Sequence, residues 1–118
     1  MARLIRPAFW GAMLFALVMA SLPQPPQLPG SPSDKIQHVL AFAVLAGLAA
    51  GAYREASLLR LWAGLSAFGA LIEIVQAIPV LHRDSDIVDW VADTLAAGLV
   101  LLAIALFRRI RGSGLRPG

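Results

Sequence analysis

The chain contains no cysteine, and charged residues make up only 14% of its 118 residues. The first absence excludes a disulfide, a thiolate metal site and a cysteine nucleophile. The second leaves a sequence that is 58% hydrophobic, with a mean hydropathy of +0.73. A soluble domain of this size could not bury so much apolar surface, whereas a lipid bilayer takes it up directly. We therefore expect an integral membrane protein.

The sequence also lacks the short motifs of several common enzyme classes. It has no glycine-rich phosphate loop, no His-Glu-x-x-His metal motif and no Gly-x-Ser-x-Gly nucleophile motif. The formal net charge of +3 would favour a nucleic-acid partner in a soluble protein. Here the arginines stand at the ends of apolar segments, so membrane topology explains them better. We expect the lipid bilayer as partner, no nucleic acid, and neither a cofactor nor a metal.

Apolar runs separated by polar or proline-rich breaks predict an all-α fold, an integral membrane bundle of four transmembrane helices in a single domain over residues 1–118. We expect the helices at residues 4–22, 34–53, 57–78 and 86–107, followed by a frayed cytoplasmic tail over 108–118. Five prolines and a glycine within residues 21–33 predict an extended loop. Ser33 is the expected N-cap of the second helix, with Asp34 in its first turn.

Three features of these helices have alternative interpretations. The first apolar segment has a basic start and small residues near Val18–Ala20, so it fits an uncleaved helix, which we favour, or a cleavable signal peptide. Gly47 and Gly51 form a pair that permits close helix packing in lipid, although glycine is also simply frequent in membrane helices. The three tryptophans fit an aromatic belt at the membrane surface better than a binding box: Trp10, Trp62 and Trp90.

Basic residues are distributed unequally between the two sides of this predicted bundle. Lys35 and Arg83 fall on one side. All other arginines fall on the opposite side: Arg3, Arg6, Arg54, Arg60, Arg108, Arg109, Arg111 and Arg116. Because cytoplasmic loops carry the excess of basic residues, both termini and the middle loop are expected in the cytoplasm, with the protein in the inner membrane as a multi-pass protein.

Acidic residues show the opposite distribution. Only Glu55 lies on the cytoplasmic side, and the other acids lie toward the outer side: Asp34, Glu73, Asp84, Asp86, Asp89 and Asp93. The charge-free runs of the last three helices are too short to span a bilayer unless their charged outer ends are included. A charge facing lipid there would cost roughly 2.5–3.5 kcal/mol. These side chains should therefore face one another or a water-filled cleft.

Helical spacing supports this convergence. Asp86, Asp89 and Asp93 fall on one face of the last helix. Asp34 lies one turn from His38, and Glu73 lies one turn from Gln76. Each of the three helices thus presents one polar stripe at the same outer end.

These residues also carry a resemblance to a known family. Asp34, Lys35 and His38 open one helix, Glu73 and Gln76 close the next, and Arg83 is followed six residues later by Asp89. The combination, which covers about residues 34–101, resembles the VanZ-like membrane protein family. Asp93 stands where that family usually has asparagine, and Ala96 where a glycine is common. The resemblance implies a VanZ-like transmembrane domain with a cell-envelope role, linked by the family's name to resistance against glycopeptides such as teicoplanin, and it implies no particular reaction.

The candidate site residues have more than one possible role. His38, Glu73 and Asp89 are the candidate catalytic residues, because histidine titrates near neutrality and buried carboxylates have shifted pKa values. The candidate ligand-binding residues are Asp34, Lys35, Gln76, Arg83 and Asp93. His38 could instead be a packing histidine or a metal ligand, and Glu73 could belong to a structural ion pair. Asp89 and Asp93 could share a proton or bind a cation.

Three functions are compatible with this pattern. The first is a VanZ-like protein whose outward-facing polar pocket binds an envelope lipid or a lipid-linked precursor, with His38, Glu73, Arg83 and Asp89 as its centre. The second is a membrane-embedded hydrolase or transferase that acts on a lipid-linked phosphate through acid–base catalysis. The third is a structural or assembly subunit whose polar groups serve helix association alone. The sequence does not indicate the oligomeric state.

Overall fold

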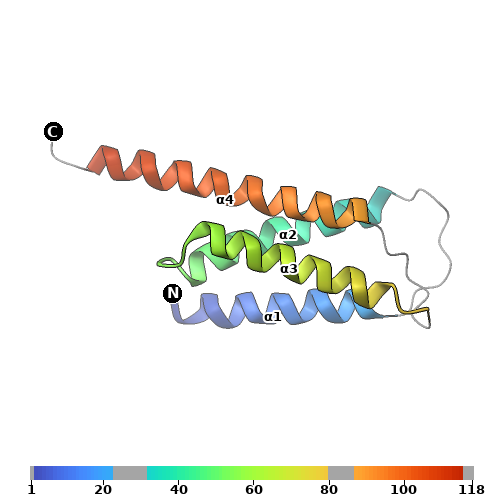
Figure 1. Ribbon diagram of the computed structural model, residues 1–118. Coiled ribbons are helices and arrows are strands. Elements are labelled where there is room, and N and C mark those ends of the chain that lie inside the picture. Colours follow the sequence, from blue (N-terminus) through green and yellow to red (C-terminus); the bar gives the residue numbers. More distant parts are fainter. Residues whose placement is uncertain (1, 23–31, 80–86, 116–118) are drawn as a thin grey trace.

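The computed structural model describes residues 2–22, 32–79 and 87–115. In these ranges the chain forms four α-helices and no strand, which confirms the predicted all-α class and the number of helices. The helices are α1 (Ala2–Ser21), α2 (Pro32–Ala52), α3 (Leu58–Gln76) and α4 (Ile87–Leu115). They lie side by side and alternate in direction, so the start of α1, the α2–α3 turn and the end of α4 share one end of the bundle (Figure 1).

The helix boundaries differ from the prediction in two places. Helix α2 begins at Pro32 and not at Asp34, so Ser33 lies inside the helix and is not its N-cap. Proline is favoured at the first helical position because its missing N–H has no partner there anyway. Helix α4 continues to Leu115, so the predicted frayed tail is wrong over residues 108–115. Arginine, leucine and isoleucine support a helix there, and each glycine opposes it by only about 1 kcal/mol.

Helix α2 forms the centre of the packed core. Its buried side chains are mostly small, which lets its neighbours approach closely. It packs most extensively against α4 and also contacts α1 and α3. The buried apolar residues include Phe42, Leu45, Ala46, Ala49 and Ala50 of α2, Leu65 and Ile72 of α3, and Ala97 and Leu101 of α4. Helix α1 contributes Phe9 and Ala20.

Helices α3 and α4 are joined by a reciprocal pair of tryptophan hydrogen bonds. Trp62 Nε1 of α3 donates to the Thr94 carbonyl of α4 over 2.8 Å. Trp90 Nε1 of α4 donates to the Ser66 carbonyl of α3 over 2.9 Å. The Ser66 and Thr94 hydroxyls are 3.0 Å apart, within hydrogen-bond distance of each other. These polar groups fix the register of the two helices, a role that adds to the predicted belt position of the two tryptophans.

The glycines that permit close packing are not the predicted pair. A Cβ at Gly98 would lie 3.0 Å from Trp62 Nε1, and a Cβ at Gly69 would lie 3.2 Å from Trp90 Cδ1. Gly47, in contrast, has nothing within 4 Å of its Cβ position, and Gly51 meets only the Ile5 side chain at 3.6 Å. The two glycines therefore make room for the two tryptophan rings between α3 and α4.

Three helices are long and apolar enough to cross a membrane: Leu4–Ser21, Leu58–Gln76 and Ile87–Gly112. The apolar part of α2, Ile36–Ala52, is shorter than a full span. Large apolar side chains cover the outside of the bundle, with Leu4, Leu59, Ile74 and Leu99 each more than two-thirds exposed. Such a surface is suited to lipid rather than to water.

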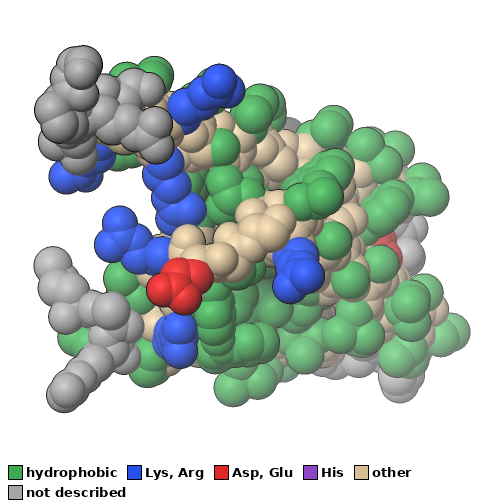
Figure 2. Space-filling model, turned by 60° about the vertical axis from the view of Figure 1, so that its left-hand side comes forward, with side chains coloured by type: hydrophobic (Ala, Val, Ile, Leu, Met, Phe, Trp, Pro, Cys, Tyr) green, Lys and Arg blue, Asp and Glu red, His purple; other side chains and the backbone are tan. Residues whose placement is uncertain are grey.

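Charge is separated between the two ends of the bundle. Arginines gather at the end that holds the α2–α3 turn, together with Glu55 (Figure 2). We call this the arginine end. The buried acidic side chains, Glu73 and Asp93, belong to the opposite end, where α3 finishes and α4 begins. We call this the carboxylate end. The predicted grouping of basic and acidic residues is therefore present in the bundle.

Candidate functional site

The carboxylate end brings polar side chains from three helices together. Glu73 and Gln76 lie in the last turns of α3, where they are 9% and 2% exposed. Asp89 and Asp93 lie in the first two turns of α4, one helical turn apart. His38 lies in the second turn of α2. We call these five residues the polar cluster.

The closest contact in the polar cluster joins His38 to Asp93. The His38 Nδ1 atom lies 3.5 Å from the Asp93 Oδ2 atom, and the two side chains are 18% and 1% exposed. Neither Asp93 oxygen makes a hydrogen bond to any residue that the structure describes. A buried carboxylate is strongly unfavourable unless it is paired or protonated. The contact with His38 is therefore the interaction by which the described part of the fold accommodates the Asp93 carboxyl group.

Glu73 and Asp89 complete the surroundings of the histidine. Both carboxyl groups, like that of Asp93, act electrostatically on the His38 ring. Glu73 comes from α3 and Asp89 from α4, so His38 of α2 faces acids from two neighbouring helices. In a medium of low dielectric constant, such interactions are much stronger than in water. The three carboxyl groups of the polar cluster therefore lie near enough to His38 to influence its charge.

Gln76 has a partner within the protein. Its amide Nε2 donates to the Ala20 carbonyl over 3.4 Å, and both residues are buried. Ala20 lies in the last turn of α1, where backbone carbonyls lack a partner inside the helix. Gln76 thus supplies a hydrogen-bond donor to one backbone carbonyl at the C-terminal end of α1. Its ligand-binding role stays a prediction.

A groove opens beside the polar cluster. It has a volume of about 500 Å³ and lies between α1 and α2, with Ile72 of α3 also in its wall. Its lining is apolar except for Gln37 and His38. Phe15, Leu40 and other exposed apolar side chains form its rim. His38 therefore belongs to both features, because it lines the groove and contacts Asp93.

The orientation of the His38 imidazole determines which of its ring nitrogens is available to a ligand. Because Nδ1 is on the Asp93 side, Nε2 lies at the opposite edge of the His38 ring. A carboxylate that holds Nδ1 fixes the orientation of the imidazole and leaves Nε2 as the atom that can accept or donate a proton. Such a pair can bind a polar head group by hydrogen bonding or exchange a proton with it.

Other predicted site residues lie partly or wholly outside the described residues. Asp34 and Lys35 belong to the first turn of α2, one turn before His38, but their side chains are not described. Arg83, with Asp84 and Asp86, lies outside the described residues altogether. Within the described ranges, no group of three or more histidine or acidic side chains is arranged to hold a metal ion.

Helix α1 forms a wall of the groove, a position that the polar spacing of the other three helices does not predict. The groove is lined there by small residues at four-residue spacing, Ala12, Ala16 and Ala20, with Phe15 and Met19 at the rim. A four-residue repeat of alanine places small side chains along one face of a helix. That repeat in the first apolar segment was the signal that could have indicated a hollow beside α1.

Comparisons with known proteins do not identify the chain. No protein-family model, no curated protein and no solved structure matches it. The resemblance to VanZ-like membrane proteins therefore depends on the sequence pattern alone, and the function has to be argued from the groove and the polar cluster.

Proposed function

We propose that this protein is a multi-pass inner-membrane protein of the cell envelope that binds an envelope lipid or lipid-linked precursor at the polar cluster. The observation that carries the proposal is the position of His38, at the boundary between an apolar groove and the buried Asp93 carboxylate. An amphiphile has the same two parts, an apolar chain and a polar head. The groove matches the chain, and the His38–Asp93 pair matches the head group.

Membrane insertion and its direction can be tested separately from lipid binding. In this proposal both chain termini and the α2–α3 turn lie in the cytoplasm and the polar cluster faces outward, because cytoplasmic segments carry the excess of basic residues. The absence of native cysteine makes a labelling test direct. Ser57→Cys and Gly112→Cys, both at exposed positions of the arginine end, should react with a membrane-impermeant maleimide only after the cells are opened. Labelling of either variant in intact cells would contradict this topology.

Lipid binding is tested by blocking the groove from its rim. Val44 lines the groove and is 57% exposed, so Val44→Trp fills the groove without disturbing the core. Val18, which is 47% exposed on α1 and does not line the groove, gives the matched control Val18→Trp. With a photoreactive acyl-chain lipid, crosslinking to α1 and α2 should fall in Val44→Trp and persist in Val18→Trp. Equal crosslinking in both variants would refute binding in the groove.

A second candidate function is acid–base hydrolysis or group transfer on a lipid-linked phosphate. The observation that favours it is the orientation of His38, whose Nδ1 faces Asp93 and whose Nε2 is at the opposite edge of the ring. A general base held in this way typically accelerates a reaction by about 10²–10⁴-fold. The purified wild-type protein and Asp93→Asn should then differ in turnover of a lipid-linked phosphate by at least about 10²-fold. If both proteins bind the lipid-linked phosphate and neither turns it over, catalysis is refuted and only the binding function remains.

A purely structural role makes a different prediction for the same variants. If the polar cluster served only helix association, Val44→Trp would have no phenotype, because it leaves the cluster intact. Variants of the cluster would instead lower the amount of protein in the membrane. Normal membrane levels combined with lost lipid binding would therefore exclude the structural role.

A further inference from the structure

The arginine end carries a strong excess of positive charge. Its described arginine side chains come from α1, α3, α4 and the α2–α3 turn: Arg6, Arg54, Arg60, Arg108, Arg109 and Arg111. Glu55 is the acidic residue among them, so six positive charges face one negative charge, a net charge of +5. No ion pair between Glu55 and an arginine is found within the described residues. This excess of positive charge attracts anions to the arginine end.

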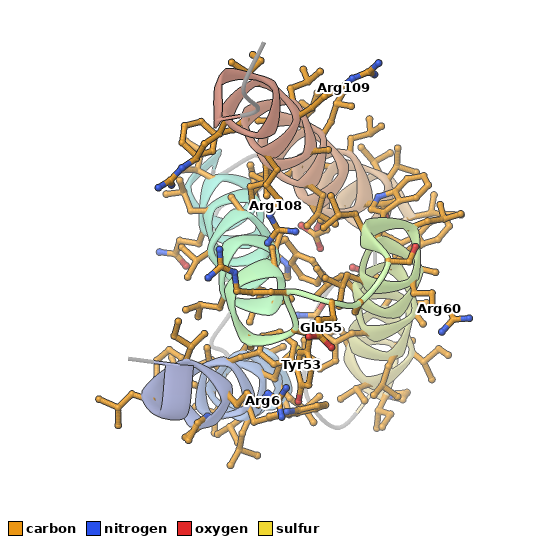
Figure 3. The ribbon with its side chains drawn as sticks, turned by 90° about the vertical axis from the view of Figure 1, so that its left-hand side faces the viewer. Arg6, Tyr53, Glu55, Arg60, Arg108 and Arg109 are labelled. Atoms are coloured by element: carbon orange, nitrogen blue, oxygen red, sulfur yellow. The ribbon has the colours of Figure 1, made fainter. Side chains whose placement is uncertain are left out.

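Arg6 differs from the other arginines because its guanidinium is held in place. Its Nε donates to the Ala52 carbonyl at the end of α2 over 2.9 Å. The guanidinium carbon also lies 4.8 Å from the centre of the Tyr53 ring, a cation–π contact. Figure 3 looks onto this end and shows Arg6 next to Tyr53. Tyr53 is itself fixed, since its hydroxyl accepts a hydrogen bond from Trp10 Nε1 over 2.7 Å.

Arg6 and Tyr53 retain hydrogen-bond donors that no described residue uses. Arginine has five N–H donors, and one of those of Arg6 is used by Ala52. The four on its terminal nitrogens have no partner among the residues that the structure describes. The Tyr53 hydroxyl accepts from Trp10 and can still donate its own hydrogen. A guanidinium beside a hydroxyl donor is suited to a phosphate group, which accepts paired N–H bonds from arginine.

The surroundings of Arg6 favour a lipid phosphate over a soluble one. Trp10 and Leu14 follow Arg6 at four-residue intervals, so the three side chains form one stripe on α1. Trp10 is 55% exposed and Leu14 is 63% exposed. The stripe thus leads from a cation through an amphipathic ring to an apolar side chain, the same order as in a phospholipid that enters a bilayer.

We propose that Arg6 and Tyr53 form a binding site for the phosphate diester of an anionic membrane lipid. The site is separate from the groove at the carboxylate end, although it depends on the bundle lying in a bilayer. Arg54 and the exposed arginines of α4 supply a general positive potential that attracts anionic lipid to this end. Arg6 and Tyr53 supply the fixed hydrogen-bond donors that retain it.

The test compares two arginines with the same charge and different surroundings. Arg6→Gln removes the fixed guanidinium, and Arg109→Gln removes an exposed one that has no contact with Tyr53. The full chain is purified in detergent, and bound phosphatidylglycerol or phosphatidylcholine is counted by native mass spectrometry. The wild type should retain phosphatidylglycerol in preference to phosphatidylcholine. Its affinity should fall by about 10- to 100-fold in Arg6→Gln, and by about fivefold or less in Arg109→Gln.

Tyr53→Phe gives a second variant that keeps the ring and removes the hydroxyl, which is both the proposed donor to the phosphate and the acceptor of Trp10 Nε1. It retains the cation–π contact, so it should remain folded and lose about 3- to 10-fold in phosphatidylglycerol affinity. Inorganic phosphate should not displace the lipid; displacement would assign the site to a soluble anion and overturn the proposal. Equal losses in Arg6→Gln and Arg109→Gln would also overturn it, because they would indicate general charge attraction. Arg6→Gln should cause the same relative loss of phosphatidylglycerol when it is combined with Val44→Trp, which blocks the groove, so that this test is separated from that of the groove.

Discussion

The packing of Trp62 against Gly98 leads to a quantitative prediction for Gly98→Ala. The new Cβ would lie 3.0 Å from Trp62 Nε1 and 3.4 Å from its Cε2 atom. The ring is not free to move, because Trp62 Nε1 donates to the Thr94 carbonyl, one turn before Gly98. Overpacking costs about 1–3 kcal/mol, and a weakened hydrogen bond costs about 1 kcal/mol. Alanine recovers about 1 kcal/mol of helix propensity, so the free energy of unfolding should fall by about 1–3 kcal/mol.

Gly47 provides the matched control on α2. Nothing lies within 4 Å of its Cβ position, so Gly47→Ala should raise the free energy of unfolding by about 0.5–1 kcal/mol. Unfolding by denaturant in detergent micelles, followed by tryptophan fluorescence, measures both variants. A double-mutant cycle with Trp62→Leu adds a second check, since Gly98→Ala should be harmless once the ring is gone. Equal stability of Gly98→Ala and Gly47→Ala would refute the proposed close approach of α3 and α4.

Two further predictions concern charge. His38→Ala leaves the buried Asp93 carboxylate without its histidine and should lower the free energy of unfolding by about 3 kcal/mol, whereas Asp93→Asn should change it by less than about 1 kcal/mol. The opposite order in denaturant unfolding would contradict a stabilising contact between His38 and Asp93. Arg108→Gln removes the 3.0 Å hydrogen bond from Arg108 Nη2 to the Ala50 carbonyl and should cost about 2 kcal/mol, while the exposed Arg109→Gln should stay within about 0.5 kcal/mol in the same assay.

The sequence predicts the helices well because their signals are local. Long apolar runs and the breaks between them determine where a membrane helix starts and stops, and every helix boundary except the C-terminal end of α4 lies near its expected position. The position of a charge along the chain also determines the end of the bundle at which it lies. His38 and Asp93 lie at the same end and come within 3.5 Å of each other. The end of α4 differs from the predicted frayed tail, because Arg108 donates to the Ala50 carbonyl of α2 and the helix continues to Leu115.

Contacts that depend on the rotation of one helix against another could not be predicted. Gly47 and Gly98 look equivalent in the sequence, and only the position of Trp62 makes one of them necessary for packing. The groove has the same origin, because it requires the small face of α1 to be turned toward α2 beside His38. Hydropathy predicts that a helix is present, but it carries little information about which face of that helix packs against which neighbour.

Other buried polar groups of the bundle differ from Asp93 in their hydrogen bonds. Trp62 and Trp90 each donate to a backbone carbonyl of the neighbouring helix, and Arg108 and Gln76 do the same for carbonyls near helix ends. These groups follow the rule that a buried polar atom has a partner. Asp93 is 1% exposed, makes no hydrogen bond within the described residues, and has His38 at 3.5 Å. Asp93 instead faces a histidine that also lines the groove, and this is the arrangement on which the proposed binding site depends.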